Sequence, residues 1–441
     1  MPEKRPAPPA YLSWLVWALA ATFYLSGFYQ RVAPAVMTDQ LMAGFGIGAT
    51  ELGALSAFYF YSYVAIQIPT GILADYWGPR KLLTTGAFVA ALGAFLFALA
   101  PSIGFAKLGR LFIGGAVGVA WVSLLKLSMH WFPPRRFAMT NGLALLFGLG
   151  GAVSAGVPLR LLVEHFGWRP VMFISALAAF LIAVFLWIIV RDDPSERGYA
   201  SFAPPEKPRA LSFKALLSGL KTLAGFKNTW LLSLVPSGVA GPILAFSGLW
   251  GVPFFSTHYG LSQPQSAALA STLLVAWGVG GPILGALSDR IGRRKPLYVA
   301  GCYISCFGWA VILFVPHLPV WLLTLMILMV GFASGSMILG FAFIKESVPS
   351  SLSGTVSGVC NMGVMIGPMV LQPAMGWIMD RNWEGALQDG IRIYHIHAYR
   401  SAFILMLGWA LVSAVLILFT TETHCRQMVE SSSSQIPGLP R

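Results

Sequence analysis

Three basic side chains interrupt long apolar stretches of this sequence, and their chemistry calls for an explanation. Arg31 lies within the run 11–36, and Arg110 and Lys126 lie within the run 105–129. An arginine at the centre of a membrane-spanning helix costs about 2.5 to 3.5 kcal/mol, so it normally faces a water-filled cavity or an oppositely charged partner. The first question is therefore which acidic groups could neutralise these residues.

The acidic residues do not supply such partners. The chain has 16 Asp and Glu residues, and each falls in a tail, in a loop or at the end of an apolar run. Basic groups without matching carboxylates can instead bind a small anionic solute through charge-assisted hydrogen bonds. The sequence therefore predicts an anion-binding site that includes Arg31, Arg110 and Lys126.

Uncharged side chains in the same and later runs extend this candidate site. Tyrosines can line a cavity with hydroxyl groups and ring edges, and an amide in a run of small residues must find a partner. From the tyrosines of the first two runs, Tyr24, Tyr29, Tyr59, Tyr61 and Tyr63, we assign Tyr24, Tyr29 and Tyr61 to the site together with Asn361. Trp250 and Gln372 are further candidates of the same kind.

A structural role is an alternative explanation for each of these residues. Arg31 can extend its side chain to the outer interface, and Lys126 lies about one turn from the end of its run. Arg160 can pair with Glu164 one helical turn later. Aromatic residues in apolar runs also serve in packing or in interfacial belts.

Composition places these runs in a membrane. Hydrophobic residues make up 56% of the 441-residue chain, charged residues make up 10%, and the mean hydropathy is +0.72. These values lie outside the usual range of soluble domains. The chain has a formal net charge of +13, but its basic clusters lie in tight turns between apolar runs, so they do not call for a nucleic-acid partner.

Twelve runs are long enough to cross the hydrocarbon core as helices. The predicted spans cover residues 11–36, 51–69, 82–100, 105–129, 140–163, 171–190, 230–255, 266–287, 297–315, 320–344, 355–379 and 402–419. We predict an all-α integral membrane fold made of two six-helix bundles. The predicted bundles are residues 1–190 and 229–422, joined by a charged, proline-rich cytoplasmic linker at 191–228 and followed by a cytoplasmic tail at 423–441.

The distribution of basic residues predicts the orientation. With both termini in the cytoplasm, about 20 of the 29 Lys and Arg residues fall on the cytoplasmic side, as the positive-inside rule requires. The first run is too long for a signal-peptide core and continues into a polytopic chain, so we expect it to remain as a helix. We expect the protein to reside in a bacterial inner membrane.

One motif occurs twice, once in each predicted bundle. GILADYWGPRK begins at Gly71, and GALSDRIGRRK begins 214 residues later at Gly285. Both copies carry two glycines, an aspartate and basic residues, at Gly71, Asp75, Gly78, Arg80 and Lys81 and at Gly285, Asp289, Gly292, Arg293 and Arg294. Such a repeat indicates duplication of a six-helix unit, an arrangement typical of transporters whose halves move about a central site.

On these residues the chain resembles the major facilitator superfamily. The first copy matches the family's signature loop, Gly-x-Leu-x-Asp-x-x-Gly-x-basic-basic, and departs from its common form at Tyr76 and Pro79. A second family motif, an Arg that opens a glycine-rich fourth helix, is matched by Arg110, Gly114, Gly115 and Gly118. The similarity extends over residues 11–420.

The resemblance implies a role for the repeated loop in closing the cytoplasmic side. Asp75 would accept hydrogen bonds from amides at the start of the eleventh span, near Ser353 and Gly354. Asp289 would do the same at the start of the fifth span. A simpler reading is that the charges of the loop only mark the cytoplasmic side and fix the topology.

The sequence thus predicts a secondary transporter, not an enzyme, that moves a small anionic organic solute by alternating access. The first span resembles the family's organic-anion and anion:cation symporter branch, although Gln30 stands where many of those carriers have an Asp. One alternative is proton-driven efflux of lipophilic or siderophore-like compounds, which usually needs an embedded acid. Another is a non-transporting membrane receptor with the same fold.

Symport, exchange and uniport remain open at this stage. A proton-coupled mechanism would have to use a group such as Glu51, Asp39 or His130, or carry the proton with the substrate. We expect no cofactor and no metal, since the four cysteines lack metal-type spacing. The expected partners are the substrate, a proton or counter-ion and membrane lipid, with the protein as a monomer.

Overall fold

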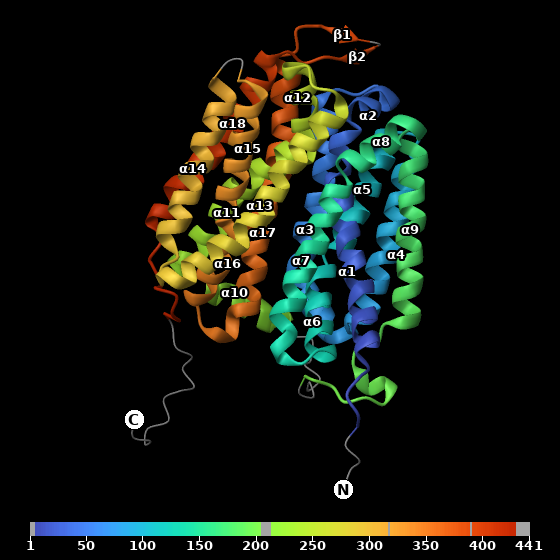
Figure 1. The fold of residues 1–441 in the computed structure, drawn as a ribbon, viewed down its shortest axis with the longest axis vertical. Coiled ribbons are helices and arrows are strands. Elements are labelled where there is room, and N and C mark those ends of the chain that lie inside the picture. The colour runs from blue at the N-terminus through green and yellow to red at the C-terminus, as the bar shows by residue number, and fades with distance from the viewer. Residues whose placement is uncertain (1–4, 204–212, 316–317, 389, 429–441) are drawn as a thin grey trace. The chain divides into compact units, whose positions relative to one another are not determined.

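The computed structural model describes residues 5–203, 213–315, 318–388 and 390–428, and helices dominate these ranges (Figure 1). In the N-terminal part the helices are α1 (Ala10–Val32), η1 (Ala33–Val36), α2 (Thr38–Phe45), α3 (Ala49–Trp77), α4 (Pro79–Ala98), α5 (Ile103–Val117), α6 (Ala120–Trp131), η2 (Pro134–Arg136), α7 (Phe137–Ser154), α8 (Val157–Phe166), α9 (Trp168–Ile189) and η3 (Pro194–Arg197).

The rest of the chain continues in the same way. Its elements are α10 (Phe213–Leu223), α11 (Lys227–Ala245), the π-helical turn η4 (Phe246–Trp250), α12 (Gly251–Tyr259), α13 (Gln263–Ile291), α14 (Lys295–Phe314), α15 (Val320–Ser334), α16 (Met337–Glu346), η5 (Ser350–Leu352), α17 (Ser353–Arg381), β1 (Leu387–Gln388), β2 (Ile391–Arg392), α18 (Ile396–Leu416) and η6 (Ile417–Phe419). The predicted all-α fold is confirmed, with one two-residue hairpin added.

The predicted number of membrane spans agrees with the structure. In the described residues, eleven helical segments are long and apolar enough to cross a membrane. The pair α2 and α3 gives a twelfth, and because α2 is bent by 112° from the following helix, α3 is the spanning part of that pair. The molecule is therefore an integral membrane protein.

Several predicted spans are broken where the sequence pattern indicated one continuous helix. The fourth span divides into α5 and α6, the fifth into α7 and α8, and the tenth into α15 and α16. Two of these breaks lie at close approaches between helices, because a Cβ on Gly118 would lie 2.4 Å from Ile66 and one on Gly335 would lie 2.5 Å from the backbone of Gly280. Contacts of this kind depend on tertiary packing, which periodicity does not report.

The contacts divide the chain into two units. The first unit comprises residues 1–211, 244–275 and 369–403, and the second comprises 212–243, 276–368 and 404–441. In the first, α4 packs between α5 and α9, while α3 packs on α5 and α1 on α7. In the second, α14 packs on α15. The division of the sequence at 190 and 229 into two duplicated bundles stays a prediction.

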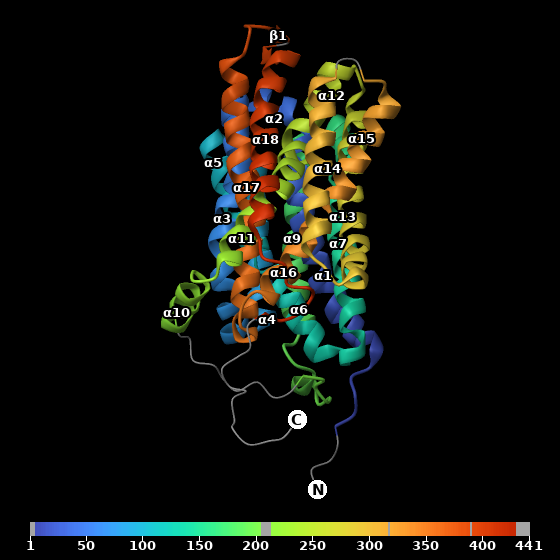
Figure 2. The same ribbon diagram turned by 90° about the vertical axis from the view of Figure 1, so that its left-hand side faces the viewer.

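One end of the first unit carries α2, α12 and the hairpin, and we call it the hairpin end (Figure 1). There β1 and β2 pair antiparallel, with Leu387 opposite Arg392 and Gln388 opposite Ile391. Figure 2 shows the hairpin projecting beyond the ends of α17 and α18. It connects the last two spans, and its residues help to line the cavity described below.

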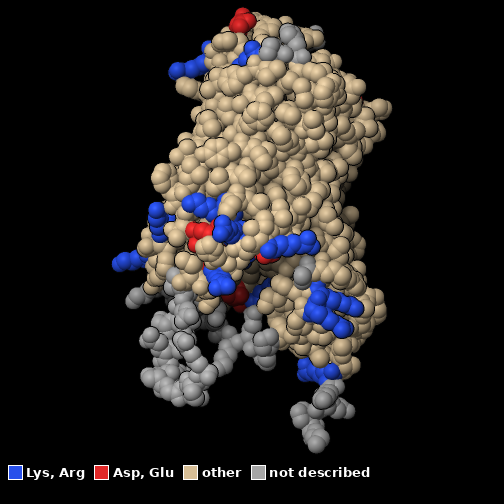
Figure 3. All heavy atoms as spheres, turned by 60° about the vertical axis from the view of Figure 1, so that its left-hand side comes forward, with Lys and Arg blue, Asp and Glu red and all other residues tan. Residues whose placement is uncertain are grey.

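The charged side chains are distributed as a membrane-spanning chain requires. On the face drawn in Figure 3, Lys and Arg gather toward the ends of the helices and leave the middle of the surface uncharged. Large apolar side chains such as Phe185, Trp187 and Val412 are instead exposed on this protein. Exposed apolar side chains along the helices suit contact with lipid.

Candidate functional site

Arg31 lies near the end of α1 and is only 4% exposed. Its Nε donates a hydrogen bond of 3.3 Å to the hydroxyl of Tyr59, which in turn donates to the carbonyl of Gly27 at 3.2 Å. The guanidinium lies over the ring of Phe28 at 4.5 Å and near that of Tyr63 at 5.2 Å. Among the described residues no carboxylate forms an ion pair with Arg31.

Arg110 reaches the same tyrosine from α5. Its guanidinium carbon lies 4.9 Å from the centre of the Tyr59 ring, and its Nη1 donates to the carbonyl oxygen of Gln30 at 2.5 Å. The side chain is 1% exposed, yet its Nε and Nη2 find no hydrogen-bond partner in the part of the chain that the structure describes. Buried guanidinium donors without acceptors are costly, so they favour an acceptor supplied from outside the protein.

Lys126 lies away from Arg31 and Arg110 and is paired with an acidic residue of the repeated loop. Its Nζ lies 3.0 Å from Oδ1 of Asp75 and also donates to the carbonyl of Ala74 at 3.3 Å. Sixteen residues separate it from Arg110, a distance of about 24 Å along a helix axis. The structure therefore brings Arg31 and Arg110 together at Tyr59 and links Lys126 to the repeated loop.

The three tyrosines assigned to the site, Tyr24, Tyr29 and Tyr61, differ from one another in their contacts and exposure. Tyr24 packs against Phe28 and Trp121 at ring distances of 5.0 and 5.2 Å. The hydroxyl of Tyr29 lies 2.9 Å from Oγ of Ser175, and the side chain of Tyr61 is 39% exposed.

Two tyrosines that were not assigned, Tyr59 and Tyr63, instead contact Arg31. They lie four residues apart, so they share one helix face, whereas Tyr61 lies on the other; this periodicity is the signal that would have selected them.

The candidates in later spans lie apart from this group in the chain. Asn361 belongs to the second unit and is half-buried. Trp250 and Gln372 meet in the first unit, where the indole Nε1 donates to the carbonyl of Gln372 at 3.3 Å. The amide of Gln372 donates to the carbonyl of Leu244 at 3.2 Å, so Trp250 ties η4 to α17 and Gln372 ties α17 to the end of α11.

The first copy of the repeated loop is anchored to the segment that follows α9. Gly78 has φ +79°, and a Cβ there would lie 2.2 Å from the Asp192 carboxylate, so the turn requires glycine. The Arg80 amide donates to that carboxylate at 2.5 Å, and its guanidinium lies 4.3 Å from the Trp187 ring centre. Burial raises the pKa of Asp192, and the Arg80 hydrogen bond opposes this shift.

The segment after α9 also docks onto α6. Nδ1 of His130 lies 2.8 Å from Oδ2 of Asp193, and the Asp193 side chain accepts from the amide of Ser195 at 2.7 Å. Burial alone would raise the pKa of Asp193, but hydrogen bonds from Ser195, Ser201 and His130 outweigh it and lower the pKa to about 2. This carboxylate therefore remains ionised at neutral pH and holds the start of the predicted linker.

The second copy of the loop forms a denser ionic network. Arg294 donates to Asp289 at 2.6 Å and to Glu346 at 2.8 Å, and its backbone amide donates to Glu422 at 3.0 Å. Gly292 has φ +69°, as the tight turn requires. The expected contacts of Asp75 with Ser353 and of Asp289 with the fifth span would join different units, and they stay predictions.

A carboxylate that sequence analysis did not select organises the hairpin end. Asp380, near the end of α17, accepts hydrogen bonds from the amides of Ala49 and Thr50 at 3.2 and 2.8 Å and from the Thr50 hydroxyl at 2.5 Å. It also accepts from Tyr394 at 2.5 Å and from Arg392 at 3.1 Å. The carboxylate thus caps the N-terminus of α3, where the helix dipole favours negative charge.

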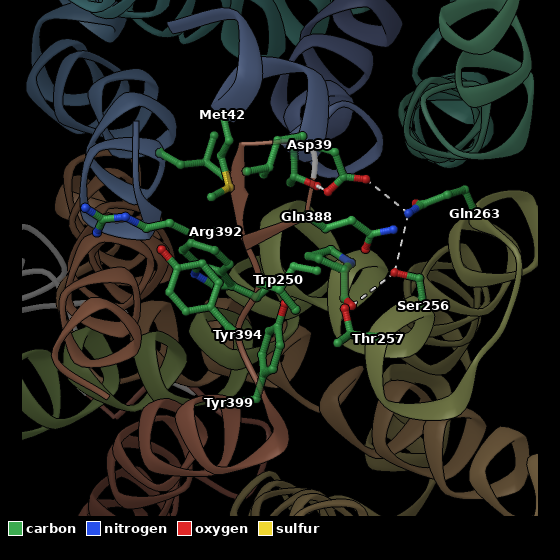
Figure 4. A pocket seen from close by; sticks show the side chains of 15 residues that line it. Asp39, Met42, Trp250, Ser256, Thr257, Gln263, Gln388, Arg392, Tyr394 and Tyr399 are labelled. Atoms are coloured by element: carbon green, nitrogen blue, oxygen red, sulfur yellow. Dashed lines mark hydrogen bonds between the residues drawn. The ribbon is translucent and has the colours of Figure 1, made fainter. Parts of the chain in front are cut away.

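The hairpin end also encloses a cavity of about 510 Å³ (Figure 4). Its walls come from α2, α3, α12, the start of α13, the hairpin and α18, all within the first unit. The lining residues are Thr38, Asp39, Met42, Leu52, Trp250, Pro253, Ser256, Thr257, Gln263, Gln388, Ile391, Arg392, Ile393, Tyr394 and Tyr399. Figure 4 shows Asp39 directed toward Gln263, with Trp250, Tyr394 and Tyr399 below it.

Comparison with known proteins places this fold in a family. The sequence model of the Major Facilitator Superfamily matches residues 16–250 and 244–434, so the chain belongs to this superfamily. A bacterial homologue of the human lysosomal transporter Spinster, in an inward-facing unoccupied conformation, superposes with a TM-score of 0.74 at 16% identity, covering 93% of this chain and 97% of that one.

Two curated relatives are similar over most of their length. The glycerol-3-phosphate transporter of Bacillus subtilis is 23% identical, with 86% of this chain and 86% of the relative covered. A probable nitrate/nitrite transporter of Mycobacterium tuberculosis is 26% identical, with 84% of this chain and 86% of the relative covered. The chain is accordingly a membrane transporter of this superfamily.

Proposed function

We propose that this transporter carries a small organic anion by alternating access, and that Arg31 and Arg110 bind the anion. The observation that carries the proposal is the pair of buried guanidiniums that both lie near the ring of Tyr59, with two Arg110 donors that lack a partner among the described residues. An anion would accept from these donors and offset the repulsion between the two cations.

Two of the similar proteins support an anionic cargo. The two curated relatives described above are named for glycerol 3-phosphate and for nitrate and nitrite, which are anions. The ion pair of Lys126 with Asp75 suits a role near the cytoplasmic loop better than direct contact with substrate. We therefore centre the anion site on Arg31 and Arg110 and assign Lys126 to closure of the loop.

Counterflow in proteoliposomes tests this function. Wild-type protein should exchange labelled glycerol 3-phosphate or another organic anion from a panel of carboxylates and phosphate esters, and nitrate serves as the inorganic comparison. Because a hydrogen bond to a charged group is worth about 1.5 to 3 kcal/mol, Arg31→Gln and Arg110→Gln should each raise the half-saturation concentration by about 10- to 100-fold.

Lys107→Gln serves as the matched control. Lys107 lies one turn before Arg110 on α5 and pairs with Glu51, so its loss removes a charge from the same helix but leaves the anion site intact. Equal losses in all three variants would contradict the assignment. Efflux of lipophilic dyes without anion exchange would favour the drug-efflux alternative, and no flux of any solute would favour the receptor.

The orientation belongs to the same proposal. Both termini and the linker would lie in the cytoplasm of a bacterial cell, and the hairpin end would face outward. Proton symport, exchange and uniport respond differently to a pH gradient. The transport rate in the same proteoliposomes, measured with and without such a gradient, distinguishes the three modes.

A further inference from the structure

The cavity at the hairpin end contains an acidic group that the anion-transport proposal does not use. Asp39 lies in the first turn of α2, and its side chain is one of the lining groups (Figure 4). Its Oδ2 accepts from Nε2 of Gln263 at 3.1 Å, and its Oδ1 accepts from the hydroxyl of Thr38 at 3.4 Å. Two neutral donors at these distances leave most of the acceptor capacity of a carboxylate unfilled.

No cation of the protein neutralises this carboxylate in the described part of the chain. Arg160 acts on Asp39 electrostatically, but its guanidinium donates to Glu164 and to the carbonyl of Val36, both at 2.8 Å. Arg392 lines the cavity through its stem, while its guanidinium pairs with Asp380.

The neighbouring carboxylates differ from Asp39 in this respect. Glu164 is paired with Arg160 and Asp380 with Arg392, whereas the ion pairs of the described residues do not include Asp39.

The walls around this charge are aromatic and polar. Trp250, Tyr394 and Tyr399 are each less than 5% exposed and form the buried part of the lining. Gln388 and Thr257 are exposed and lie at the open side. Aromatic rings around a carboxylate attract a cation through their negative faces, and a desolvated site strengthens the attraction.

We propose that this cavity binds a small organic ammonium ion, with the positive nitrogen beside the Asp39 carboxylate and its carbon substituents against Trp250 and Tyr399. The volume of about 510 Å³ leaves room for several carbon atoms besides the charged nitrogen. The site is separate from the Arg31 and Arg110 pair and does not depend on the proposed anion. It adds a second class of ligand to this transporter.

Occupation of the cavity has a conformational consequence. The ligand would contact α2 from the predicted first half together with α12 and α13 from the second. Any opening of the hairpin end that separates these helices breaks the hydrogen bond between Asp39 and Gln263 and removes one wall of the site. An organic cation bound there therefore favours the arrangement in which Asp39 of α2 contacts Gln263 of α13.

Thermal unfolding of the purified full-length protein in detergent tests the proposal with choline as the probe. A ligand that binds only the folded state raises the melting temperature with concentration, and the change in intrinsic tryptophan fluorescence, to which Trp250 contributes, gives an independent titration. Dimethylbutanol, the uncharged carbon analogue of choline, controls for shape. We expect choline to stabilise the wild-type protein and dimethylbutanol to have no such effect.

Substitutions at Asp39 test whether choline binds beside this carboxylate. Asp39→Asn should weaken choline binding by about 10- to 100-fold, while Asp39→Glu and the control Glu51→Gln should keep it. Melting of Asp39→Asn without ligand shows that this variant is folded.

Three results would overturn the proposal. They are the absence of choline stabilisation in the wild type, an equal response to dimethylbutanol, and full choline binding by Asp39→Asn. The double variant Arg31→Gln, Arg110→Gln separates this proposal from the anion site. It should lose anion exchange and keep the choline response, and loss of both would place choline at the anion site instead. Absence of anion transport in the wild type would leave the choline result unchanged.

Discussion

At the scale of single residues, the central feature is one tyrosine shared by two arginines. Tyr59 is 0% exposed, accepts from Arg31 and lies against the guanidinium of Arg110. The sequence predicted the embedded arginines because their charge conflicts with the surrounding apolar residues. It did not select Tyr59, because neighbouring residues of α3 differ only in the face they occupy, and the orientation of α3 is set by its packing on α5.

This arrangement predicts the effect of removing one hydroxyl. Tyr59→Phe keeps the ring beside both guanidiniums but leaves Nε of Arg31 without its partner. The hydroxyl holds the Arg31 guanidinium in position for the anion, and a hydrogen bond to a charged group is worth about 1.5 to 3 kcal/mol, so its loss should lower the anion affinity by about 10- to 150-fold while the protein remains folded. Counterflow with the anion identified by the transport screen measures the half-saturation concentration, and thermal melting reports folding.

Tyr61→Phe provides the discriminating comparison. Tyr61 lies two residues later on the same helix, and its side chain is 39% exposed. If Tyr61→Phe weakens the anion and Tyr59→Phe does not, the tyrosine assigned from sequence is the correct one and the pair of arginines at Tyr59 is not the site.

At the scale of helices, the sequence predicted where spans lie but not how they break or meet. Twelve apolar runs follow from hydropathy alone, because each helix must satisfy its own backbone in lipid. The breaks near Gly118 and Gly335 depend on which group approaches each glycine, the side chain of Ile66 at the first and the backbone of Gly280 at the second. The Asp380 cap joins residues about 330 positions apart, and no local pattern reports such a contact.

The Asp380 cap predicts that α17 holds the start of α3 at the hairpin end. Asp380→Asn replaces an acceptor of five hydrogen bonds by a group with one acceptor oxygen, and the side chain is 18% exposed. Since hydrogen bonds to charged groups contribute about 1.5 to 3 kcal/mol, the variant should melt at a lower temperature. A cysteine at Ser256, which lines the cavity, should also react faster with a membrane-impermeant maleimide.

Glu384→Gln is the matched control for this change. Glu384 follows Asp380 by one turn, is exposed, and has no ion pair within the described residues. Its substitution should leave both the melting temperature and the labelling rate near those of the parent. Unchanged values for Asp380→Asn would mean that the remaining contacts hold α3 without the carboxylate.

At the scale of the whole molecule, the duplicated loops have diverged in their partners. Asp75 of the first copy pairs with Lys126, whose side chain is 12% exposed, while Asp289 of the second joins Arg294 in a network with Glu346. The sequence revealed the repeated motif because glycine, aspartate and basic residues recur at fixed spacing. It did not reveal these partners, since Lys126 and Glu346 lie outside the motif.

The basic residues of these loops also make a prediction about the orientation of the whole chain. Lys and Arg near the ends of spans remain in the cytoplasm during insertion, so the turn of Arg135 should lie inside and the hairpin end outside. Both Arg135 and Gln388 are exposed, so a cysteine at either position can react. Cys302, Cys306 and Cys360 are buried, and replacement of the half-buried Cys425 by serine leaves a suitable background.

Labelling of intact cells with an impermeant maleimide then decides the orientation. Gln388→Cys should react in intact cells, and Arg135→Cys should react only after the membrane is permeabilised. The hairpin end would then face the exterior, and the organic cation of the Asp39 cavity would reach its site from outside the cell. The opposite labelling pattern would invert the molecule, place that cavity on the cytoplasmic side and show that basic residues do not set the topology of this chain.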